Sequence, residues 1–81
     1  MEGAGILPGD FVAVRCQDRV EDGQIAVVDV DGEVTVKRVA RRGLVLWLHP
    51  ENERYRPIAV DLRTHEARIL GKVVGVVRQV E

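Results

Sequence analysis

Short apolar runs recur along the chain about every ten residues, with turn residues between them, and this spacing is typical of an all-β protein. Helical periodicity, in which apolar residues recur three and four positions apart, is poor throughout. We therefore expect an all-β fold built as a strongly bent antiparallel sheet or a partly open barrel. The pattern predicts six strands, at about residues 11–16, 24–30, 33–40, 44–49, 58–61 and 68–78.

The clearest local signal is the dipeptide Asp31-Gly32, which is typical of a two-residue type I′ hairpin turn. A loop of this length sets the register of the two strands that it joins. It places Ala26 opposite Lys37, and side-chain alternation then puts Lys37 on the face that carries Val39. Near the C-terminus, the glycines at positions 71 and 75 interrupt a long strand and indicate bends or bulges.

Lys37 is the candidate chemical group, and two interpretations of it follow from the pattern. The ordinary one is a lysine on the solvated face of a hairpin. The alternative is a lysine that gives up its proton and acts as a base. Ala26 is small, so it is expected to leave space above the sheet where a substrate peptide or a serine approaches the amine.

Length and composition limit the remaining possibilities. The 81 residues form a single domain, 1–81, with a thin core. Twelve basic and thirteen acidic residues give a formal charge of −1, which does not suggest a dedicated nucleic-acid or membrane binder. No signal peptide and no apolar run long enough to span a membrane is present, so we expect a cytoplasmic protein without membrane contact.

The remaining candidate side chains carry little chemistry. Cys16 is the single cysteine, which excludes an internal disulfide and a cysteine-based zinc site. His49 and His65 lack metal-site spacing and are interpreted as surface or loop residues, so no metal and no cofactor is predicted. Trp47 is predicted to lie in the core.

Four blocks of the chain resemble the C-terminal domain of LexA-type repressors, which are Ser/Lys autoproteases. They are distributed over nearly the whole chain, in the order and at the spacing of that family. The blocks are 5–10 (GILPGD), 29–38 (DVDGEVTVKR), 50–58 (PENERYRPI) and 69–78 (ILGKVVGVVR).

The resemblance implies a mechanism and assigns Lys37 a role in it. In the family a serine attacks an Ala-Gly bond of its own chain, and a neutral lysine removes the proton of that serine. Lys37 lies 36 residues after Met1, as the family's interval requires, so it is expected to be the general base. The serine would stand immediately before Met1, and the chain is therefore expected to be catalytically incomplete. The Ala4-Gly5 pair follows the serine position, where the family does not cut.

The resemblance also implies partners. In the family, an N-terminal helix-turn-helix domain reads operator DNA and a RecA filament on single-stranded DNA promotes cleavage during the SOS response to DNA damage. That domain and the cleavage loop are absent from this chain, and Arg38, Arg41 and Arg42 are better explained as a charged hairpin end than as a phosphate site. A homodimer is expected through the C-terminal strand, at Lys72, Val73, Val74, Gly75, Val76, Val77 and Arg78.

Other functions remain open at this stage. Within the same fold, the chain resembles UmuD-like accessory subunits of an error-prone polymerase. Signal peptidases share the fold and the Ser/Lys pair, but their sequence blocks match less well. A standalone, non-enzymatic β-barrel interaction module is the alternative from a different class, because fold alone does not decide function.

Overall fold

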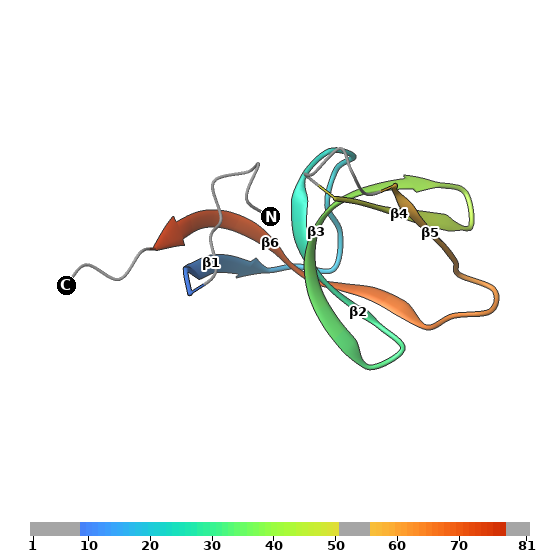
Figure 1. Ribbon diagram of the computed structural model, residues 1–81, viewed down its shortest axis with the longest axis horizontal. Coiled ribbons are helices and arrows are strands. Elements are labelled where there is room, and N and C mark those ends of the chain that lie inside the picture. Colours follow the sequence, from blue (N-terminus) through green and yellow to red (C-terminus); the bar gives the residue numbers. More distant parts are fainter. Residues whose placement is uncertain (1–8, 51–55, 78–81) are drawn as a thin grey trace.

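The computed structural model describes residues 9–50 and 56–77, and every element in them is a β-strand (Figure 1). No helix in this part of the chain is long and apolar enough to cross a membrane. The strands are β1 (Phe11–Cys16), β2 (Ile25–Val30), β3 (Glu33–Arg42), β4 (Val45–His49), β5 (Ile58–Asp61) and β6 (Ala67–Val77).

The six strands form one open sheet in which every neighbouring pair is antiparallel, and this confirms the expected fold class. Their order is β1-β6-β2-β3-β4-β5, so the last strand lies between the first two. Among the described residues of β6, only Gly71 and Lys72 are paired on both sides, and the strand before them pairs with β2 alone. Beyond Lys72 it pairs with β1 alone, and Figure 1 shows these two strands extending together to one end of the molecule.

The turn between β2 and β3 has the predicted geometry. Asp31 and Gly32 have φ angles of 51° and 89°, as both central residues of a type I′ turn require. Ala26 is the register partner of Lys37, as expected. The next turn differs slightly from the prediction, because β3 continues through Arg42 and the chain reverses at Gly43, where φ is 59°.

Two bulges bend β6, and each lies next to one of the two glycines at which a bend or bulge was expected. The register shifts around Leu70 where β6 pairs with β2, and around Val74 where it pairs with β1. The extra residue in each case immediately precedes a glycine. Gly71 is buried, and a Cβ atom there would lie 2.7 Å from the carbonyl oxygen of Arg15 and against the side chain of Val14. The first strand therefore approaches β6 at a distance that only glycine permits.

One face of the sheet carries the core. Its buried members are Ala26, Val28, Val39, Leu46, Leu48 and Val60. The prediction that Trp47 lies in this core is wrong. Leu46 and Leu48 of β4 are buried, so strand alternation places Trp47 between them on the opposite face, where it is half-buried.

Candidate active site

Lys37 lies in the middle of β3 and is half-buried. It shares its face with Val39 and with its cross-strand partner Ala26, which are both core residues. The lysine is therefore at the margin of the core face and not on the outer face of the hairpin. Ala26 itself is fully buried, so the space expected above it is occupied. A group that reaches the amine does so at the exposed part of the lysine side chain.

A second lysine stands on the other side of Ala26. Lys72 of β6 is also a register partner of Ala26, and Arg15 of β1 is the register partner of Lys72. Directly opposed residues of an antiparallel pair project from the same face. We call Lys37, Lys72 and Arg15 the cationic row. Within the described residues, none of the three makes an ion pair or a side-chain hydrogen bond.

Sequence reasoning did not find this row. It placed Lys72 in the dimer strand, and it gave Arg15 no role. The row exists because β6 inserts between β1 and β2, a pairing of segments that are far apart in the chain. Local patterns carry no signal for such a pairing.

The serine expected to act with Lys37 is not among the 81 residues, since the sequence contains no serine. The expected serine position precedes Met1, and Met1 itself lies outside the described residues. The structure therefore places the lysine and leaves the second member of the pair untested.

An open groove of about 920 Å³ adjoins the face that carries Lys37. Val39, two residues further along β3 on that face, contributes to its lining. Arg19, Arg41 and Arg68 also line it. Its apolar lining residues are Val20, Val39, Leu46, Leu62, Ala67, Ile69 and Leu70.

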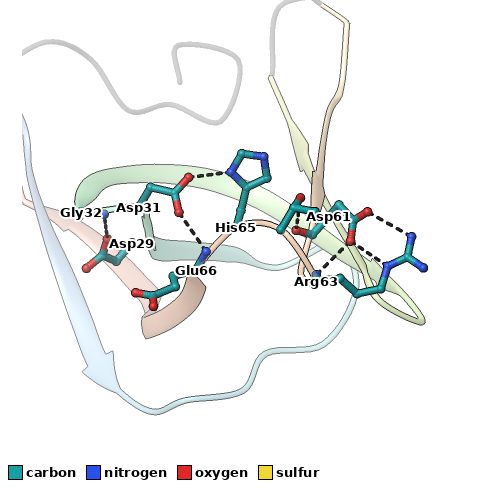
Figure 2. A network of polar contacts seen from close by, with 8 residues as sticks. Asp29, Asp31, Gly32, Asp61, Arg63, His65 and Glu66 are labelled. Atoms are coloured by element: carbon teal, nitrogen blue, oxygen red, sulfur yellow. Dashed lines mark hydrogen bonds and ion pairs between the residues drawn. The ribbon is translucent and has the colours of Figure 1, made fainter.

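A separate polar network ties the β2–β3 turn to the loop between β5 and β6 (Figure 2). The Asp31 carboxylate contacts His65 Nδ1 at 2.6 Å and accepts a hydrogen bond from the Glu66 amide at 2.9 Å. The hydrogen bond to His65, followed by that from Glu66, lowers the pKa of Asp31 below its usual 3.8.

At the start of the same loop, the Asp61 carboxylate binds Arg63. Asp61 accepts hydrogen bonds from the Arg63 amide at 2.9 Å and from its guanidinium at 3.1 Å. These contacts with Arg63 lower the pKa of Asp61. The network is largely exposed to solvent. Its contacts connect the β2–β3 turn to the loop between β5 and β6, so we interpret it as structural.

Neither of the two histidines considered in the sequence analysis lies in the cationic row. His65 is exposed in the loop between β5 and β6, while His49 is half-buried at the end of β4. In residues 9–50 and 56–77, no group of three or more His, Cys, Asp or Glu side chains is placed to hold a metal ion.

The residues predicted for dimerisation lie in β6, apart from Arg78, which is outside the described residues. Val74, Val76 and Val77 are exposed there. They belong to the part of β6 that pairs with β1 alone.

The family model of the Peptidase S24-like proteins matches residues 1–74 of this chain. The chain belongs to the Peptidase S24-like family. It is 49% identical over 78 residues to the LexA repressor of Shewanella loihica, a match that covers 96% of this chain and 38% of the relative. It is 47% identical over 81 residues to the LexA repressor of Aeromonas salmonicida, covering 100% of this chain and 39% of the relative.

This S24-like chain is thus a LexA-like C-terminal domain, and it spans less than two-fifths of the length of the curated relatives that it matches. The LexA repressor of Glaesserella parasuis shows the same relation, with 49% identity over 78 residues and 37% of its length covered. The predicted resemblance to LexA-type repressors is confirmed.

Proposed function

We propose that this domain is the self-cleavage and dimerisation part of a LexA-like transcriptional repressor of the SOS response. Lys37 acts as the general base in a Ser–Lys pair, and the serine is the residue that precedes Met1 in the longer protein. Operator DNA is bound by a helix-turn-helix domain outside this chain, a RecA filament promotes cleavage, and the protein acts in the cytoplasm.

One observation carries the proposal. In a chain that matches the S24-like family over residues 1–74, the residue at the family's Ser-to-Lys interval is a half-buried lysine beside the core. A lysine that serves as a base needs a defined position beside the group whose proton it removes, and the middle of β3 holds Lys37 at the margin of the core face.

The experiment extends the chain upstream through a Gly-Asp-Ser motif and the cleavage loop of a LexA relative. Incubated at alkaline pH, this extended protein is expected to cut itself into two fragments of constant mass. Lys37→Ala is expected to abolish cleavage, because no group then removes the serine's proton. Lys37→Arg is also expected to fail near neutral pH, since a guanidinium keeps its proton. Intact-mass spectrometry over time measures both.

Two controls separate the role of Lys37 from general damage. The unextended 81-residue chain, treated in the same way, is expected to keep its mass because it has no serine. Thermal melts of Lys37→Ala should resemble those of the parent. Cleavage by the folded Lys37→Ala protein at the parental rate would show that Lys37 is an ordinary surface lysine.

A further inference from the structure

We propose that the cationic row formed by Lys37, Lys72 and Arg15 binds an extended, acidic peptide segment through its carboxylates. Such binding does not require Lys37 to act as a base. It bears on the proposed function, however, because a carboxylate beside an ammonium group favours the charged amine. An occupied row would therefore oppose proton removal by Lys37.

The register of three strand pairs brings these cations together. Lys37 and Lys72 flank Ala26 from opposite sides, two strands apart, which corresponds to roughly 10 Å between their backbones. Arg15 is the next residue of the row, about 5 Å beyond Lys72. Carboxylates at alternate positions of an extended peptide are about 7 Å apart, so two of them match this spacing through flexible lysine side chains.

The face around the row lacks the carboxylates that would neutralise it. Neither β1 nor β6 contains an acidic residue. Asp29 of β2 is on the opposite face from Ala26, because the two are an odd number of residues apart. On β3, Glu33 shares the face of Lys37 but lies four residues away, at the hairpin end.

The distribution of ion pairs across the molecule points the same way. Arg42, Arg63 and Arg68 each have an aspartate partner within 4 Å. The row therefore concentrates cations without such partners on one side of the sheet, where Lys37 and Lys72 are partly withdrawn from water. A bound anion there is less screened than one on an open surface.

A pocket beside the row supplies room for a side chain of the ligand. Its volume is about 440 Å³, and Arg15, Lys72 and Arg19 contribute to its lining. Glu21 is the acidic residue at this pocket. Gln17 and Gln24 also line it and offer amide groups to a polar ligand.

A peptide fits these features better than a nucleic acid does. Non-specific binding of duplex DNA draws on about 6–10 phosphate contacts, and the row offers three cations, two of them half-buried.

The test uses the 81-residue chain and an acetylated, amidated hexapeptide of alternating Glu and Ser. At low salt, titration followed by nuclear magnetic resonance is expected to shift the amide signals of Arg15, Ala26 and Lys72. Lys72→Gln and Arg15→Gln are each expected to weaken binding by about two- to fivefold, and added salt should weaken it further. Arg15 is exposed, so its variant tests the row even if Lys72→Gln folds poorly.

Arg63→Gln is the matched control, because it removes one positive charge from the loop between β5 and β6, away from the row. It should bind the peptide like the parent. Parental affinity in both Lys72→Gln and Arg15→Gln would overturn the proposal, as would equal binding of a Gln-Ser peptide. If a short DNA duplex displaced the peptide when present at a lower concentration than the peptide, the row would be a nucleic-acid site and the proposal would be wrong. Because no cleavage is measured, failure here leaves the Ser–Lys proposal standing.

Discussion

Asp31 forms the β2–β3 turn and also fastens that turn to a distant loop. Its backbone adopts the positive φ of a type I′ turn, and its amide donates to the carbonyl oxygen of Glu66 at 2.7 Å. Its carboxylate contacts His65 and accepts from the Glu66 amide (Figure 2). Aspartate suits both tasks, because it tolerates left-handed backbone and is a strong acceptor when ionised.

Because of these hydrogen bonds, the stability of the domain is expected to decrease in acid. Hydrogen bonding lowers the pKa of Asp31 in the folded chain, so its contribution is complete above the unfolded value of 3.8. It is lost as the pH falls from there through the lowered folded pKa. Asp31→Asn is therefore expected to melt at a lower temperature than the parent near neutral pH, and the difference should narrow in acid. Circular dichroism melts between about pH 7 and pH 2.5 measure this.

Asp18→Asn provides the comparison for that experiment. Asp18 is exposed and makes no side-chain hydrogen bond with the described residues, so its substitution should leave the melting curve close to that of the parent. Asp22 and Asp61, whose pKa values are also lowered, keep part of the acid dependence in either variant. Parallel pH curves for the parent and Asp31→Asn would contradict the assigned role.

At the scale of elements, the two glycines of β6 serve different purposes although both follow a bulged residue. Gly71 is where the backbone of Arg15 comes too close for any side chain. Gly75 is less restricted, because a Cβ there would meet Ala13 at 3.8 Å, an ordinary contact. Close approach of a neighbouring strand therefore explains the first glycine and leaves the second replaceable.

Gly71→Ala is expected to destabilise the domain by about 1–3 kcal/mol, because either β1 or β6 must shift to admit the methyl group. Gly75→Ala makes the same chemical change without the clash, and its effect should stay within about 1 kcal/mol. Urea unfolding of both variants measures the difference. Equal free energies of unfolding would mean that β1 moves away from Gly71 at little cost.

How far the sequence predicts this fold depends on how local each feature is. The Asp31-Gly32 turn and the pairing of Ala26 with Lys37 follow from a two-residue loop, and the structure confirms both. Trp47 was assigned to the wrong face because β4 is apolar on both sides, so alternation did not say which set points inward. The place of β6, and with it the position of Lys72 beside the candidate base, depends on long-range pairing.

At the scale of the whole molecule, the paired ends of β1 and β6 form a two-stranded ribbon that projects from the sheet (Figure 1). Valines on this ribbon are exposed, as is Phe11. From Val73 onward, the side of β6 away from β1 has no partner strand among the described residues. An apolar strand with a free edge is prone to pair with another chain, and a two-fold dimer closes such an interface.

We therefore expect a homodimer through β6, and Val74→Asp or Val76→Asp should shift it toward monomer. Each fully enclosed valine contributes about 1.5–3 kcal/mol, which a carboxylate at the same position would forfeit. Sedimentation velocity at roughly tens of micromolar protein measures the proportions of monomer and dimer. Val34→Asp alters another exposed valine, on the β2–β3 hairpin, and should leave the assembly unchanged. A parent chain that sediments as a stable monomer would refute the interface.

The position of β6 between β1 and β2 also has a consequence for how the chain is made. Among the described strands, the ribosome completes β1 first, yet its partner there, β6, is made after all the others. Until Ala67–Val77 has emerged, β1 lacks its partner among the described strands, while β2 to β5 can already pair in sequence order. Nascent chains stalled before Ala67 are thus expected to be cut by protease within β1 and protected within the β2–β3 hairpin. The pairing of β1 with the rest of the sheet therefore waits until β6 has been synthesised.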